Sequence, residues 1–185
     1  MRGVRPRQVG RRWVAALVPW SVLGLVLATA MLVPVSPAWA DIRAARDAME
    51  AGRFAEAYEA LRPAAQSGNA DAEELIGVMY AMGLGVERND ERAFDWYLRA
   101  SLKGHPGAQS GIGWYYEVGR GLPAPDPVRA YAWYTLSAMG GDPDAAMSQE
   151  EIAKRMSEDE IAAALELVSD YASWLYPDQN PDLRR

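Results

Sequence analysis

The sequence predicts an all-α fold, a right-handed α-solenoid of helix-turn-helix repeats that ends in a pair of C-terminal capping helices. The first observation is an internal repeat with a period of 36 residues, typical of arrays of helical hairpins. In it, Ile76, Gly77, Tyr80, Gly83 and Gly85 recur as Ile112, Gly113, Tyr116, Gly119 and Gly121. The second observation is that apolar residues within each unit follow helical spacing, and the third is that glycine-rich turns separate the helices.

The N-terminal segment, residues 1–40, has the pattern of a secretory signal peptide. Five arginines and no acidic residue precede an apolar run from Trp13 to about Val35, and the segment ends in Ala38, Trp39 and Ala40. We expect Sec-type export with cleavage after Ala40, which gives a periplasmic or secreted bacterial protein with no membrane contact after cleavage. An uncleaved anchor is the alternative, because the apolar run approaches the roughly 20 residues that span a bilayer.

Three further observations bear on export, partners and stability. Arg11 and Arg12 are typical of a twin-arginine signal, but Gly10 and Ala15 fit that signal poorly, so we interpret the pair as ordinary leader charge. Removal of the leader leaves 14 Lys and Arg against 25 Asp and Glu, a net charge of −11, which makes nucleic acid an unsuitable partner. The chain has no cysteine, so its stability comes from packing without disulfides.

The mature chain begins with a shortened helical hairpin, residues 41–68. Its helices are predicted at 43–51 and 54–66, around Gly52, with Pro63 bending the second. Ala57, Ala64 and Gly68 align with residues of the next unit at the same offset of 36.

Two full repeats follow, residues 69–104 and 105–141. The first helix of the first repeat places Ala72, Ile76 and Tyr80 in one stripe, which predicts its buried side. Gly77 and Gly113 lie inside first helices, where glycine is unfavourable unless a neighbour approaches closely. The second helices, at about 90–103 and 126–139, each carry adjacent Trp and Tyr residues, namely Trp96, Tyr97, Trp133 and Tyr134. We expect these aromatic side chains to wedge between successive hairpins.

Residues 142–175 are predicted to be the capping helices. Ser157 and Glu160 form a capping-box pattern that opens the last helix, which we expect to run through Ala163, Leu165, Leu167 and Val168 to Leu175. Residues 176–185 are rich in Pro, Asp and Asn, which predicts a frayed tail.

These residues resemble the Sel1-like repeat, a relative of the tetratricopeptide repeat. The resemblance is carried by Ala72, Ile76, Gly77, Tyr80, Gly83, Leu84, Gly85, Val86, Asn89, Arg92, Ala93, Trp96, Tyr97, Ala100 and Gly104, and by a second copy from Ala108 to Gly141. It extends over roughly residues 42–175. The resemblance implies an α-solenoid that acts as an adaptor for other proteins. Some secreted relatives that are linked to β-lactam binding are rich in cysteine, which this chain lacks.

A partner-binding surface is predicted on the concave side, which first helices line. The residues opposite the buried stripe are Glu74, Val78 and Met82 in the first repeat and Ser110, Trp114 and Val118 in the second. Our hypothesis is that Val78, Met82, Trp114 and Val118 line a groove for a peptide or protein, with Glu74 and Glu117 at its edges. The alternative is that these apolar residues are ordinary core. The charge of −11 favours a basic partner.

The sequence offers little for catalysis. His105, the only histidine, lies between Gly104 and Pro106, where we expect a helix lead-in rather than a general base. The acidic pair Glu73 and Glu74 is interpreted as a solvated helix face. We therefore expect no catalytic residue, no metal site and no cofactor. The alternative function is an envelope hydrolase or a binder of cell-wall or β-lactam ligands. The sequence does not indicate an oligomeric state.

Overall fold

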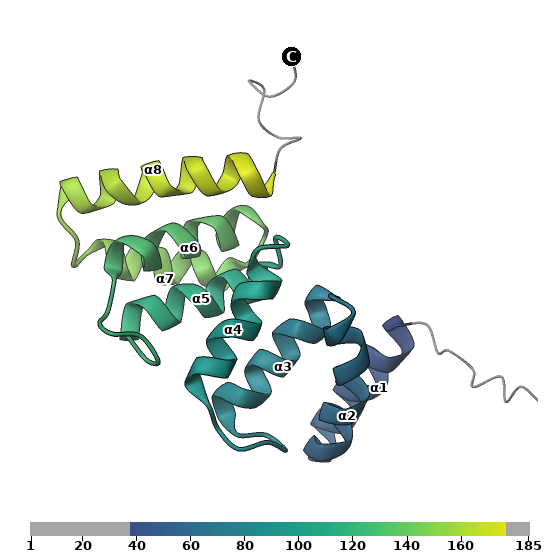
Figure 1. Cartoon of the computed structure of the whole chain (residues 1–185). Coiled ribbons are helices and arrows are strands. Elements are labelled where there is room, and N and C mark those ends of the chain that lie inside the picture. Colours follow the sequence, from purple (N-terminus) through teal and green to yellow (C-terminus); the bar gives the residue numbers. More distant parts are fainter. Residues whose placement is uncertain (1–37, 177–185) are drawn as a thin grey trace, which may run out of the picture. The chain divides into compact units, whose positions relative to one another are not determined.

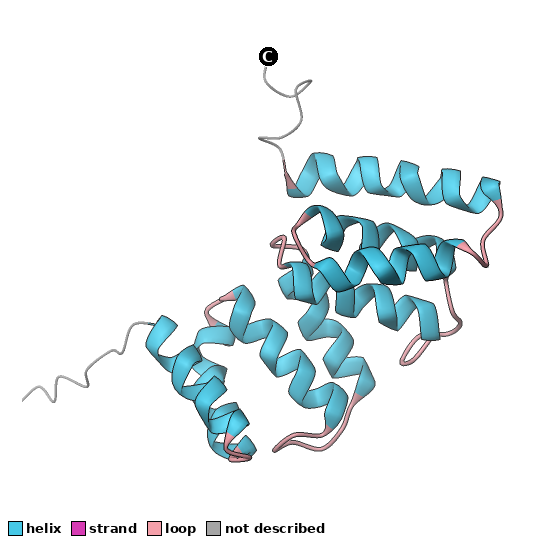
Figure 2. Ribbon diagram, turned by 180° about the vertical axis from the view of Figure 1, so that it is seen from behind, coloured by secondary structure: helices cyan, strands magenta, loops and turns pink. Residues whose placement is uncertain are grey.

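The computed structural model describes residues 38–176, and these residues form eight α-helices and no strand (Figures 1 and 2). The helices are α1 Ala38–Glu50, α2 Phe54–Gln66, α3 Ala70–Met82, α4 Asp90–Ser101, α5 Pro106–Val118, α6 Pro127–Met139, α7 Pro143–Ala153 and α8 Glu158–Leu175. Nearly all of the predicted signal peptide therefore lies outside the described residues. Within residues 38–176, no helix is both long enough and apolar enough to cross a bilayer.

Helices that follow each other in the chain pack side by side from α1 to α7. Each hairpin thus contacts the next through its second helix, as in a solenoid of stacked helix pairs. The predicted α-solenoid fold is confirmed. The last helix departs from this order, because α8 packs mainly against α6, alongside which it lies in Figure 1.

Local sequence signals set the helix boundaries. The helix N-termini from α3 to α7 are capped by Asn69, Asn89, His105, Asp126 and Asp142, whose side chains accept hydrogen bonds from backbone N–H groups of the first turn. The capping box that Ser157 and Glu160 predict at the start of α8 is present. The two longest interhelical turns begin at Gly83 and Gly119, which have φ values of 71° and 69° that favour glycine.

The hydrophobic core is continuous along the stacked helices. It includes the predicted stripe of Ala72, Ile76 and Tyr80, all buried in α3. Alanines without solvent exposure, such as Ala93 in α4 and Ala108 in α5, let neighbouring helices approach closely. A second cluster joins α6 to α7 through Tyr134 and Ile152.

The tyrosine of each predicted aromatic pair is the wedge between hairpins. A Cβ atom added at Gly77 of α3 would lie 3.1 Å from Tyr97, and one added at Gly111 of α5 would lie 3.0 Å from the same ring. Tyr97 of α4 therefore fills the space between two consecutive first helices. Trp133 also packs between successive helix pairs, because it is buried and stacks on Tyr171 of α8. Trp96 is only half-buried, and the Arg99 guanidinium of the same helix lies 4.6 Å from its ring centroid.

The last helix, α8, ends at Leu175, where the sequence predicted its end. Ala164 and Val168 are buried, whereas Ala163 and Leu165 are exposed. The helix contacts the solenoid on the side that carries Val168 and Tyr171. Tyr176, which we expected to belong to a frayed tail, is half-buried.

Candidate partner-binding face

The predicted binding residues lie on two consecutive first helices, α3 and α5. Met147 of the next first helix, α7, was not predicted. It is the repeat equivalent of Ser110, because α7 starts at Pro143 as α5 starts at Pro106. We call the surface formed by Glu74, Val78, Met82, Ser110, Trp114, Val118 and Met147 the first-helix face.

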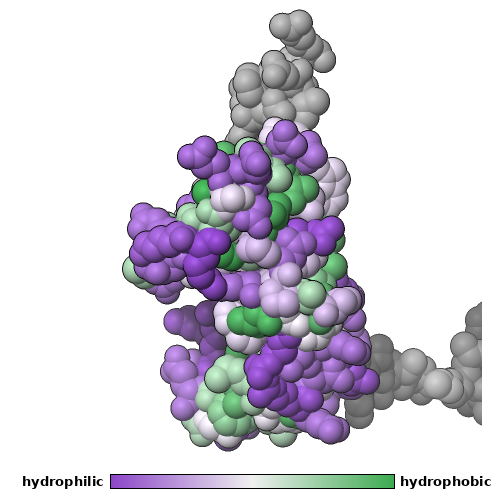
Figure 3. Space-filling view, turned by 90° about the vertical axis from the view of Figure 1, so that its left-hand side faces the viewer, coloured by the Kyte–Doolittle hydropathy of each residue, from purple (hydrophilic) through white to green (hydrophobic). Residues whose placement is uncertain are grey.

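Four large apolar side chains of the first-helix face are exposed. The exposed fractions are 66% for Met82, 40% for Trp114, 43% for Val118 and 61% for Met147, while Val78 is half-buried. These four residues are therefore not part of the core of the described chain. Single exposed apolar residues are common on protein surfaces, but Met82 and Val118 are exposed at the same position of two successive repeats, and Trp114 and Met147 add exposed apolar area on α5 and α7. Figure 3, which views one side of the molecule, shows that apolar patches reach the surface among polar side chains.

Trp114 is held in place by its neighbours. Its ring meets Tyr115 edge-on with 5.1 Å between ring centroids, and the Arg120 guanidinium lies 5.8 Å from the Trp114 centroid. Arg120 in turn pairs with Asp90, with 3.4 Å between Nε and Oδ2. Burial, together with the charge of Asp90, raises the pKa of Tyr115 to about 12. An aromatic side chain that is fixed before binding loses little conformational freedom when it contacts a partner.

Glu117 forms contacts within the chain. Its Oε2 accepts a hydrogen bond of 2.8 Å from the Tyr134 hydroxyl, and its other oxygen forms an ion pair with Arg155. Burial raises the pKa of Tyr134, and the hydrogen bond to Glu117 adds to this effect. Glu117 therefore links α5, α6 and the residues that follow α7.

Glu74 is the other carboxylate that we predicted at the edge. It is half-buried, and it forms no hydrogen bond or ion pair with the residues from 38 to 176. Burial raises the pKa of Glu74, and the nearby basic side chains of His105 and Arg46 counteract part of this rise. Its Oε1 lies beside the first turn of α5, 3.8 Å from where a Cβ atom of Gly107 would be.

His105 is a helix cap, in agreement with the predicted lead-in. Its Nδ1 accepts a hydrogen bond of 3.2 Å from the Ala108 N–H, so the proton of the neutral ring is on Nε2. Nε2 lies 3.1 Å from Asp71 Oδ1 and donates to it. Both ring nitrogens are thus occupied by bonds between α3 and α5, which leaves neither free to take a proton from a substrate.

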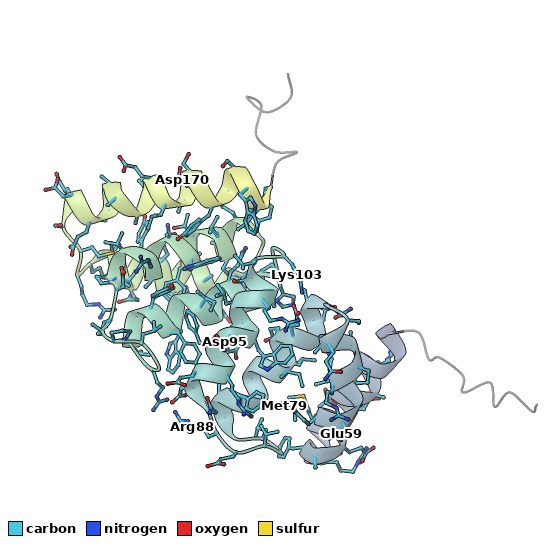
Figure 4. All side chains as sticks on the ribbon, viewed as in Figure 1. Glu59, Met79, Arg88, Asp95, Lys103 and Asp170 are labelled. Carbon is cyan, nitrogen blue, oxygen red and sulfur yellow. The ribbon has the colours of Figure 1, made fainter. Side chains whose placement is uncertain are left out.

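Glu73 is buried, so the expectation of a solvated Glu73–Glu74 face is wrong. Its carboxylate has no solvent exposure and accepts hydrogen bonds from Arg99, at 3.0 Å, and from Lys103 (Figure 4). The repeat equivalent of Glu73 is Gln109, which is also fully buried and hydrogen-bonds the Tyr176 hydroxyl at 3.0 Å. A polar residue at the same position of two repeats was the signal that could have revealed this buried position.

Among the described residues, no group of three or more His, Cys, Asp or Glu side chains is arranged to hold a metal ion. The carboxylates near the first-helix face differ in their bonding. Asp71 and Glu117 form hydrogen bonds or ion pairs with other residues of the described chain, whereas Glu74 forms none. The surface is therefore best described as an apolar row with one unpaired carboxylate beside it.

Comparisons with known proteins agree on the type of repeat. A family model described as Sel1 repeat matches residues 70–105 and 106–142. The crystal structure of a Sel1 repeat protein from Oxalobacter formigenes is 35% identical, with a TM-score of 0.55, over 62% of this chain and 88% of that chain. The structure of a protective antigen of uropathogenic Escherichia coli strains, which displays an SLR fold, has a TM-score of 0.72 at 22% identity. That match covers 77% of this chain and 31% of the antigen, and it shows the fold alone.

Two curated relatives match shorter stretches. The ERAD-associated E3 ubiquitin-protein ligase component HRD3A of Arabidopsis thaliana is 38% identical over 71 residues, which are 38% of this chain and 10% of that protein. Chitin synthase regulatory factor 2 of Schizosaccharomyces pombe is 31% identical over 87 residues, 47% of this chain and 17% of that protein. The chain thus spans only a small part of the length of these relatives.

Proposed function

Because the chain belongs to the Sel1 repeat family, we propose that it is a protein-binding adaptor without enzymatic activity, which binds a peptide or protein partner on its first-helix face. The observation that carries the proposal is the set of exposed apolar side chains on three successive first helices, Met82, Trp114, Val118 and Met147, of which Met82 and Val118 are repeat equivalents. Burial of such a row in a complex would remove apolar area from water, which is the main favourable term in protein association.

The matched relatives support a role beside other proteins. HRD3A is named as a component of a ubiquitin-protein ligase. The Schizosaccharomyces pombe relative is named as a chitin synthase regulatory factor, and a further relative, SKT5 of Saccharomyces cerevisiae, as a chitin synthase regulator. An adaptor function for this chain extends that type of role to its own repeats. The two bonds of the His105 ring support the same view, since they leave the ring without a free nitrogen for catalysis.

We place this function in the bacterial periplasm or outside the cell. Support comes from the sequence of residues 1–40, which has the basic start, apolar middle and small-residue end of a signal peptide. N-terminal sequencing of the exported protein tests the placement. The expected first residue is Asp41, and a protein that retains Met1 would contradict cleavage.

The partner segment is basic in this proposal. The mature chain has a net charge of −11, so a positively charged partner is attracted at long range and associates faster. Association rates measured at increasing salt concentration should therefore fall. A rate that does not depend on salt would contradict a basic partner.

Substitution of Trp114 by alanine tests the proposed surface. We expect Trp114→Ala to abolish capture of the partner in crosslinked envelope extract, because large aromatic residues at the centre of an interface contribute most of its affinity. The matched control is Trp174→Ala on α8, which removes a tryptophan that is 64% exposed and lies outside the first-helix face.

The control variant should capture the partner as the wild type does, and both variants should unfold at nearly the wild-type temperature. A partner that binds Trp114→Ala undiminished would show that the first-helix face is not the binding surface. A large loss of thermal stability in Trp114→Ala alone would show that this side chain belongs to the core.

A further inference from the structure

The two tyrosine wedges of the solenoid end in different polar surroundings. The second wedge, Tyr134, donates its hydroxyl proton to Glu117, and Glu117 also pairs with Arg155. The series of phenol, carboxylate and guanidinium is thus complete within the chain. The Tyr134 hydroxyl and the Glu117 carboxylate therefore both have a bonding partner within the chain.

The first wedge lacks this series, because Ala81 stands at the repeat position of Glu117. Tyr97 occupies the same position in α4 as Tyr134 in α6, and its hydroxyl has no hydrogen-bond partner among residues 38–176. The carboxylate of Glu74 and the ring of Tyr97 lie beside successive turns of α5, and Glu74 forms no ion pair with the described residues. Burial raises the pKa of Tyr97, and the negative charge of Glu74 is the next largest cause.

The charged side chains around Glu74 do not neutralise it by direct contact. Arg46 of α1 is exposed and close enough to influence the pKa of Glu74, but the two form no ion pair. His105 donates its Nε2 proton to Asp71 rather than to Glu74. A half-buried carboxylate that lacks a partner carries a desolvation cost, which a cation placed against it would offset.

We propose, resting on the adaptor function proposed above, that Glu74 determines specificity by binding a Lys or Arg side chain of the partner segment. The cation would form an ion pair with Glu74, as Arg155 does with Glu117 at a different position of α5. Val78 lies one helical turn from Glu74 on α3, and Trp114 is exposed on α5. The partner segment therefore carries a basic side chain next to a large apolar one.

The test is selection of peptides from a phage-displayed random dodecapeptide library on the purified full-length protein. We expect the selected peptides to be enriched in Lys or Arg next to a large apolar residue. Selection on the Glu74→Gln variant should remove the enrichment in basic residues. The control Glu91→Gln makes the same charge change at an exposed glutamate of α4 and should keep it.

Binding of a synthetic copy of one selected peptide then measures the energetic coupling between Glu74 and the basic residue of the peptide. Replacing its basic residue by the uncharged norleucine should weaken binding to the wild type by about tenfold, and binding to Glu74→Gln by less than twofold. An equal loss for both proteins would overturn the assignment of Glu74. The same holds if the selected peptides contain no excess of Lys or Arg.

Selection on Trp114→Ala separates this inference from the function on which it rests. If Trp114→Ala no longer binds the peptide while Glu74→Gln keeps the full dependence on its basic residue, the binding face is right and Glu74 is not its charged anchor. If the selected peptides bind Trp114→Ala as they bind the wild type, or if no peptide is enriched, the proposed face itself is wrong.

Discussion

At the scale of single residues, glycine and tyrosine form a complementary pair that recurs in the two repeats. Gly77 faces Tyr97 and Gly113 faces Tyr134, in each case with the ring of a second helix packed on the backbone of a first helix. The glycine reduces the stability of its own helix relative to alanine, and the flat contact with the ring offsets this cost. Glycine at this position is therefore a packing residue rather than a source of flexibility.

Substitution of Gly113 tests the packing role. A Cβ atom at this position would lie 2.8 Å from Tyr134, a buried ring with no room to retreat, so we expect Gly113→Ala to lower the free energy of unfolding by about 2 kcal/mol. The control is Gly107→Ala in the first turn of α5, where the nearest contact would be an ordinary 3.4 Å.

Gly107→Ala should be neutral or should stabilise the protein by up to about 1 kcal/mol, because alanine is the better helix former. Urea unfolding of both variants measures the difference. Equal effects of the two substitutions would contradict the close contact between Gly113 and Tyr134.

At the scale of helices, a buried carboxylate joins the two helices of the first full repeat. Glu73 of α3 binds Arg99 of α4 and Lys103 just beyond it, while these basic side chains stay 50% and 40% exposed. The second repeat has Gln109 at the same place, and its Nε2 donates a hydrogen bond to the Tyr176 hydroxyl instead. The same repeat position is thus satisfied by charge in one unit and by a neutral hydrogen bond in the other.

This arrangement predicts that replacing Arg99 and Lys103 lowers the stability more than replacing Glu73. Arg99→Met with Lys103→Met leaves the Glu73 carboxylate buried without a partner, and we expect it to cost about 3 kcal/mol of stability. Glu73→Gln keeps the side-chain volume and should cost only about 1 kcal/mol.

Adding Glu73→Gln to the double-Met variant should restore most of the lost stability, because it removes the buried charge. Chemical denaturation of all variants provides the measurement. If the triple variant is no more stable than the double one, the cost does not come from an unpaired carboxylate.

At the scale of the whole described fold, α8 covers α6, the second helix of the last full repeat. Val168 joins the main core, and Tyr171 stacks on Trp133 at 5.2 Å between centroids. Tyr176, just after α8, bonds to Gln109 of α5 and lies beside Gly104 at the end of the first full repeat. Terminal repeats need such a cover, because an uncovered repeat end exposes apolar surface.

Truncation tests the contribution of α8. A chain that ends at Met156 loses the cover of Trp133, so we expect its melting temperature to fall by at least about 10 °C. The control ends at Tyr176 and keeps all the contacts described for α8, so it should melt within about 2 °C of the wild type. Thermal unfolding followed by circular dichroism compares the two. Near-wild-type stability of the shorter chain would mean that α8 is not part of the cooperative fold.

The agreement between sequence and structure is closest where the relevant information is local. The helix caps at Asn69 and Asp126, the left-handed glycines and the capping box at Ser157 depend on residues within four positions of each other. For α8, the sequence pattern predicts the helix but does not select its buried stripe. Only its neighbours select Ala164 and Val168 for burial.

The sequence by itself determined the helical repeat, its period and most helix boundaries, because these follow from spacing along the chain. The tertiary structure alone decided that Glu73 is buried, that Glu117 is held by Tyr134 and Arg155, and that Glu74 has no such partner in the described chain. Three nearby carboxylates of similar helices thus have three different states. The physical reason is that the charge and burial of a carboxylate depend on side chains more than 15 positions away, which helical spacing cannot specify.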